Sequence, residues 1–122
     1  MITAPTSGEL IDAVIGFIET RVAPQMKDRD VFLARVAVNA LAAVKREIAE
    51  GPAAEAAATE RLAALLGYEG DFTELNEKLC DALRSGDMDL STPGVFDHLK
   101  ASIIDQVKID QPNYSGLKAL LP

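Results

Sequence analysis

The segment FLARVAVNALAAVKREI, residues 32–48, is apolar at almost every position. On a helical wheel its large apolar side chains lie around most of the circumference, and only one narrow stripe is polar. A helix of this kind is usually the buried centre of its domain. Aromatic residues are only 5% of the chain and Trp is absent, which favours closely packed aliphatic helices over a sheet. The segment therefore predicts an all-α, single-domain bundle around a long, mostly buried second helix.

Local signals divide the 122 residues into about five helices within one domain, 1–122. The spacing of Thr6 and Glu9 is that of a capping box, in which each side chain accepts a hydrogen bond from a free amide at a helix start. Gly51 is expected to end the second helix in a left-handed conformation, and Pro52 to begin the third. The predicted helices cover residues 8–22, 28–50, 53–66, 72–85 and 93–109.

The last helix and the chain end carry signals of their own. Thr92 is the expected N-cap and Pro93 the first helical residue. The apolar spacing predicts a buried edge formed by Phe96, Leu99, Ile103 and Val107. Three leucines lie in the C-terminal tail, residues 110–122. We expect this tail to pack back on the domain or onto a partner chain.

Charge and composition argue against several classes of protein. The formal net charge is -7, and an acidic surface repels a phosphate backbone, so nucleic-acid binding is not expected. No apolar run approaches the roughly 20 residues of a membrane-spanning helix, and the N-terminus MITAPTSGEL does not resemble a signal peptide. The single Cys80 cannot form an internal disulfide. These features predict a cytoplasmic protein that does not insert into membranes.

The polar stripe of the second helix is formed by Arg35, Asn39 and Arg46. If the helix is buried, these groups need partners, because an unpaired buried polar group costs about 1–3 kcal/mol. One hypothesis is a structural clamp, in which Arg35 and Asn39 hold the C-terminal segment through Asp105 and Asp110. The alternative is a pocket that binds a carboxylate or a phosphate. A third possibility is that the stripe faces water.

No catalytic constellation is evident in the sequence. His98 is the only histidine, and its place outside the expected apolar edge predicts a solvated side chain. With one His and one Cys, the usual structural zinc sites are excluded within one chain. Cys80 is interpreted as a packing residue, and the glycines punctuate helices rather than form a phosphate loop. We expect no metal and no cofactor.

Two segments resemble a family of small bacterial proteins of unknown function. The family pattern R-V-A-x-N-x-L-x-x-V-x-R-E, followed by Gly-Pro, matches residues 35–47 and 51–52. The pattern V-x-x-D-x-P-x-Y matches Val107, Asp110, Pro112 and Tyr114. The similarity extends from the first helix to Tyr114. Such proteins are typically encoded beside an aminoglycoside-phosphotransferase-like kinase and an acyl-CoA dehydrogenase-like enzyme, so the resemblance implies a role in acyl-chain metabolism. It assigns no catalytic residues.

Two functions from different classes follow. The first is a non-enzymatic accessory protein, a homodimer through its alanine-rich or tail surfaces, that binds the kinase-like protein or the dehydrogenase. The second is a small-ligand binding protein or minor enzyme, in which Arg35, Asn39 and Arg46 bind a carboxylate or an acyl-CoA phosphate. The two differ in whether Arg35 lines a cavity.

Overall fold

The computed structural model describes residues 3–121, which are helical with no strand among them. Its elements are a first helix α1 (Ser7–Phe17), a π-helical turn (Ile18–Val22), a 3-10 turn (Ala23–Gln25), and four more helices. These are α2 (Arg29–Leu66), α3 (Phe72–Ser85), α4 (Val95–Asp110) and α5 (Leu117–Leu120). The predicted all-α class is confirmed. None of the helices over residues 3–121 is long and apolar enough to cross a membrane.

Two compact units, Met1–Gly51 and Pro52–Pro122, make up the chain. Their boundary falls inside α2, so each unit contains one part of that helix. The break predicted at Gly51 and Pro52 is therefore wrong. Gly51 does not adopt the left-handed conformation of a helix end, whereas Gly67 does, with φ of 83°. Pro52 removes one backbone donor and crowds the carbonyl four residues before it, at a cost of about 3 kcal/mol, but the alanine-rich sequence after it has a high helix propensity.

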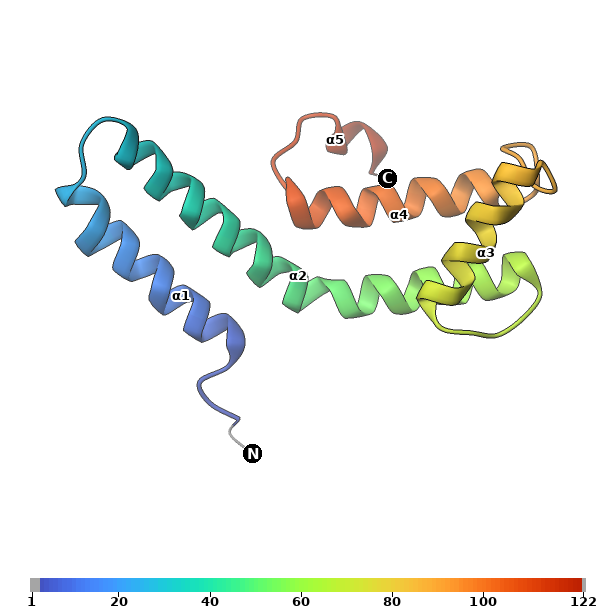
Figure 1. Ribbon diagram of the computed structural model, residues 1–122, viewed down its shortest axis with the longest axis horizontal. Helices are drawn as coiled ribbons and strands as arrows, with labels where there is room; N and C mark the ends of the chain where they lie inside the picture. Colours follow the sequence, from blue (N-terminus) through green and yellow to red (C-terminus); the bar gives the residue numbers. More distant parts are fainter. Residues whose placement is uncertain (1–2, 122) are drawn as a thin grey trace. The chain divides into compact units, whose positions relative to one another are not determined.

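The first unit is a helical hairpin, in which α1 lies antiparallel to the first part of α2 (Figure 1). Thr6 caps α1 as predicted, and its Oγ1 accepts a hydrogen bond of 3.1 Å from the amide of Glu9. Lys45 of α2 donates to both carboxylate oxygens of Asp12 in α1 at 2.8 Å. Of the described residues in this unit, none is fully buried. The burial predicted for residues 32–48 is thus not found, because a single neighbouring helix covers only one side of α2.

The second unit contains the hydrophobic core. Leu62 of α2 packs with Leu75 and Leu79 of α3, and all three are at most 2% exposed. The α3 helix begins where the sequence predicts a helix over 72–85, and Asp71 is its cap: its Oδ1 accepts a 2.9 Å hydrogen bond from the amide of Glu74. Gly86 ends the helix with φ of 83°. The predicted range, 72–85, therefore agrees with the observed helix at both ends.

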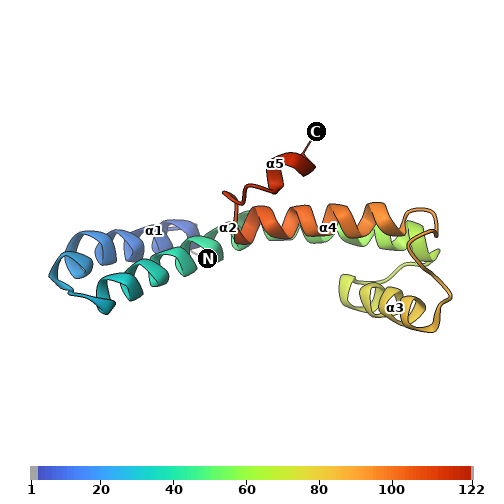
Figure 2. The same ribbon diagram turned by 90° about the horizontal axis from the view of Figure 1, so that it is seen from above.

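The α4 helix runs beside the last part of α2, in the antiparallel direction (Figures 1 and 2). It begins at Val95 after Gly94, not at Pro93. Thr92 is not its cap, because Thr92 Oγ1 accepts a hydrogen bond from the preceding Asp89 amide at 3.0 Å. The predicted buried edge is also displaced: Phe96 and Ile103 are 56% and 58% exposed. The buried residues of α4 are Val95, His98 and Ile109.

The C-terminal tail packs back on the domain, which is one of the two outcomes expected from the sequence. It forms the short helix α5 against α4, and Leu117 is buried. Leu120 and Leu121 remain exposed. Gly116 permits a close contact with the Tyr114 ring, since a Cβ atom there would lie 2.6 Å from that ring.

The core of the second unit predicts a large stability difference between two leucine substitutions. Leu79→Ala removes buried methyl groups and should lower the free energy of unfolding by about 2–5 kcal/mol in urea titrations. Leu90→Ala, at a side chain 64% exposed, is the control and should change it by less than about 0.5 kcal/mol. Equal effects of the two substitutions would contradict this core.

Candidate functional site: two faces of the hairpin and a buried histidine

The hairpin of the first unit has an exposed apolar face. We define this apolar face by seven large side chains that are each 45–59% exposed: Leu10, Val14, Phe17, Leu33, Val36, Val44 and Ile48. In α1 the three members follow a spacing of four and three, so they form one stripe. In α2 the four members, with Ala37 and Ala40 between them, form a second stripe.

Helix geometry places the two stripes on the same side of the hairpin. The half-buried residues that line the contact between the helices include Ile11 and Ile15 in α1 and Val38 and Leu41 in α2. Successive residues advance by about 100° around a helix. Counted in the direction of the chain, the exposed stripe of each helix lies roughly 100° before the line of residues that contacts the other helix. Because the helices are right-handed and antiparallel, two stripes that both precede the contact line project from the same face. The apolar face is thus continuous across both helices.

The opposite side of the hairpin is polar and contains a hollow of about 260 Å³. The π-helical turn and the first part of α2 surround it, and its polar lining is formed by Glu19, Arg35 and Asn39. Its apolar lining is formed by Ile18, Ala23, Val31, Ala34 and Val38. A π-helical segment often occurs at functional sites because it locally changes the direction of side chains. Arg35 and Asn39, which the sequence singles out, thus line the same hollow.

Arg35 and Asn39 are exposed rather than enclosed. The other predicted site residues lie outside the hollow, and Arg46 is not among the described residues that line it. Asp105 and Asp110 belong to the second unit. Both carboxylate oxygens of Asp110 accept hydrogen bonds of 3.1 Å from Gln106 Nε2. The clamp between Arg35 and these acids remains a prediction.

The second unit contains a buried network of polar side chains that the sequence analysis did not predict. His98 is only 4% exposed, so the expectation of a solvated side chain is wrong. Arg61 of α2 donates from Nε to His98 Nδ1 at 3.2 Å and from Nη2 to Ser102 Oγ at 3.2 Å. Since Nδ1 accepts this hydrogen bond, the imidazole is neutral with its proton on Nε2. A signal existed in the sequence: Val95, His98, Ser102, Asp105 and Ile109 share one helical face.

Burial lowers the pKa of His98 below its usual value, and the positive charge of Arg61 lowers it further. Both effects disfavour the imidazolium ion. The arrangement suits a structural acceptor for Arg61 better than a proton carrier near neutral pH. His98 therefore ties α4 to α2.

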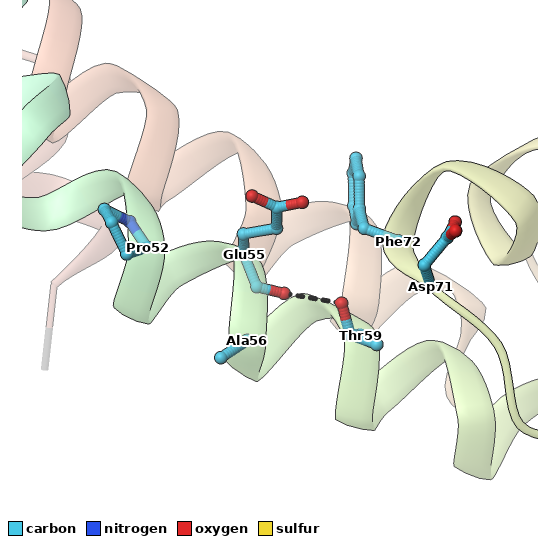
Figure 3. Close-up of a pocket in the computed structure, with 6 residues that line it drawn as sticks. All are labelled: Pro52, Glu55, Ala56, Thr59, Asp71 and Phe72. Carbon is cyan, nitrogen blue, oxygen red and sulfur yellow. Dashed lines mark hydrogen bonds between the residues drawn. The ribbon is translucent and has the colours of Figure 1, made fainter.

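A second hollow, of about 470 Å³, lies in the second unit at the start of α3 (Figure 3). Phe72 and the carboxylate of Glu55 stand on the same side of α2 in this view, with Asp71 beside the ring. Thr59 Oγ1 donates to the carbonyl of Glu55 at 2.8 Å, and Asp71 is occupied as the cap of α3. These hydrogen bonds are those of ordinary helix geometry. Among residues 3–121, no three His, Cys, Asp or Glu side chains lie together so as to hold a metal ion.

A small, all-helical protein with an unpartnered hairpin face is the class that this fold defines. The chain belongs to the family described as a domain of unknown function, DUF6285, whose model matches residues 24–114. Both sequence patterns noted above lie within the matched region, which begins after α1 and ends at Tyr114. The resemblance to a family of unknown function is thus confirmed. Comparisons with curated proteins and with solved structures found no match.

The Arg61–His98 contact predicts a pH-dependent stability. The unfolded chain binds a proton at His98 near pH 6.5, whereas the folded chain binds it only at lower pH. The free energy of unfolding should therefore be fully retained above pH 6.5 and decrease as the pH falls below it, with a slope of up to about 1.4 kcal/mol per pH unit. Urea titrations between pH 7.5 and 5.5 measure this effect.

His98→Gln is the control for this prediction, since glutamine keeps an acceptor but does not titrate. His98 is the only histidine of the chain, so no other side chain of that type contributes in this range. The substitution should remove most of the slope. An unchanged slope in the variant would assign it to other groups.

Proposed function

We propose that this protein is a non-enzymatic accessory domain that acts by binding other proteins. The observation that carries the proposal is the apolar face of the hairpin. Soluble proteins rarely leave a continuous apolar patch of several hundred Å² exposed unless it binds something. Here the patch extends over two helices and includes Phe17, 59% exposed, and aromatic side chains are enriched at protein interfaces.

The first unit also depends energetically on such a contact. An isolated helix of 11 residues, such as α1, is marginal in water, and most helix stability in proteins comes from packing of an apolar face. The hairpin has a line of half-buried residues and the ion pair of Lys45 with Asp12, whose side chains are 43% and 55% exposed. An ion pair this exposed contributes little. A protein partner on the apolar face supplies the missing burial.

The proposed partners are those that the family resemblance implies. They are a phosphotransferase-like kinase and an acyl-CoA dehydrogenase-like enzyme of bacterial acyl-chain metabolism, and the proposed compartment is the cytoplasm. Binding would depend on the apolar face either directly or through assembly of the accessory protein. The acidic character of the chain, with a formal net charge of -7, is compatible with a protein partner and not with a phosphate backbone.

Calorimetric titration of the purified protein with each of the two enzymes tests the accessory function. At least one enzyme should bind with a Kd in the micromolar range or tighter. Val36→Glu, on the apolar face, should weaken binding at least tenfold because it places a charge in the interface. Phe32→Glu is the matched control: Phe32 is 60% exposed but lies outside the face. If neither enzyme binds the wild-type protein, the accessory function is wrong.

The hollow on the polar side supports a second candidate function, the binding of a small ligand. Arg35 provides a bidentate donor for a carboxylate, and Asn39 provides both a donor and an acceptor. The carboxylate of Glu19 lines the same hollow and repels a polyanion such as the phosphates of CoA. The volume of about 260 Å³ is also small for a ligand site. A small carboxylic acid that carries a hydroxyl or amino group fits these features better.

Thermal unfolding with and without ligands distinguishes this second candidate. A panel of small hydroxy acids, amino acids and acyl-CoAs should include a hydroxy or amino acid that raises the Tm of the wild-type protein. Arg35→Ala should retain the wild-type Tm without ligand and lose the ligand-induced increase. Lys118→Ala, at an exposed side chain of the second unit, should retain it. No increase with any compound, or an equal increase in Arg35→Ala, would exclude this site.

A further inference from the structure

The apolar face could be covered by several kinds of protein. Three features of the first unit point to a second copy of the same chain. The inference rests on the proposed function, because it names the occupant of the same surface. The features are the distribution of charge between the units, the charges at the two ends of the hairpin, and the area of the face.

Charge is distributed unevenly along the chain. The first unit has six basic and seven acidic side chains and is nearly neutral, whereas the second has six basic and twelve acidic ones. Almost all of the net negative charge therefore belongs to the second unit. Two copies that associate through their first units bring two nearly neutral surfaces together, so charge repulsion at the interface is small.

The charges that border the apolar face differ between its ends. At the turn end, the exposed Arg21, Lys27 and Arg29 outnumber Asp28 and Asp30, since Glu19 lines the hollow on the other side of the hairpin. At the open end, the exposed Glu47 lies on the α2 stripe of the face. An antiparallel pairing of two hairpins puts the net positive end of each copy against the negative end of the other. A parallel pairing would put like charges together, and like-charge contacts disfavour an interface.

The area of the face is adequate for a dimer of modest affinity. Seven large side chains, each about half exposed, offer on the order of 600 Å² per copy, so two copies reach about 1,200 Å², the lower limit of a specific interface. Two hairpins packed face to face form a four-helix arrangement, the common way in which helix pairs complete a core. A twofold axis makes the contact self-complementary.

We propose that the apolar face is the interface of a homodimer, in which two hairpins pack face to face with the turn end of one against the open end of the other. The interface includes Ala37 and Ala40 of α2 and does not use the tail surface considered in the sequence. It buries Val14 and Phe17 of α1 and Val36 and Val44 of α2 in both copies.

Sedimentation equilibrium of the full chain between 1 and 100 µM tests the dimer. The chain has a mass of 13.0 kDa, so association to about 26 kDa with a micromolar Kd is expected. Val14→Glu and Val36→Glu should each raise the Kd at least tenfold, and Phe32→Glu should not. A wild-type protein that stays monomeric at 100 µM, or a dimer that tolerates both face variants, would overturn the proposal.

A charge exchange tests the antiparallel arrangement without altering the apolar side chains. Arg29→Glu and Glu47→Arg should each weaken the dimer severalfold, and the double variant should recover most of the loss. Circular dichroism at 222 nm verifies that every variant remains helical. If the double variant is weaker than either single variant, the pairing of opposite ends is wrong.

Enzyme binding separates this proposal from the accessory function. A dimer that binds neither enzyme supports the interface and removes the accessory role. A monomer that binds an enzyme through the apolar face removes the dimer and retains the accessory role.

Discussion

Two helices packed side by side share a single line of contact, and this constraint governs the first unit. The hairpin of α1 and the first part of α2 can cover only the residues between them, such as Ile11, Ile15, Val38 and Leu41, and even these are only half-buried. Every other apolar side chain of the hairpin must face outward. The helix that is apolar on nearly all sides is thus half of a hairpin whose remaining apolar side chains are exposed.

The second unit satisfies the same requirement internally. Its part of α2 is covered by α3 through Leu75 and Leu79 and is joined to α4 through the hydrogen bond from Arg61 to His98. A neutral imidazole there accepts from a guanidinium group whose partners in the network, His98 and Ser102, are both uncharged. The network holds α4 against α2. It is stable only while His98 is neutral, since a protonated imidazole would be repelled by the positive charge of Arg61. The two units therefore differ: the second has its own core, and the first leaves an apolar face exposed.

Local signals predicted the ends of helices better than their burial. Thr6 caps its helix as the sequence indicates, because a cap involves only neighbouring residues. Gly51 and Pro52 carried an equally local signal, yet the helix continues through them into a segment of strong helix formers. The placement of Arg35 and Asn39 on one side of α2 follows from their spacing of four residues. The contribution of Glu19 was not predictable, because it depends on how the π-helical turn meets α2. Burial of His98 was missed because the apolar spacing of α4 indicates an edge that includes Phe96 and Ile103, whereas the buried residues are Val95, His98 and Ile109.

Hydrogen exchange of the backbone amides at several protein concentrations tests the central claim most directly, namely that the hairpin is completed by another protein surface of its own kind. If the apolar face is the dimer interface, protection of the amides in α1 and in residues 29–51 should increase from 1 to 100 µM. Protection of α3 should stay constant, since its core is internal to the second unit. Equal protection of the hairpin amides at all concentrations would contradict the account.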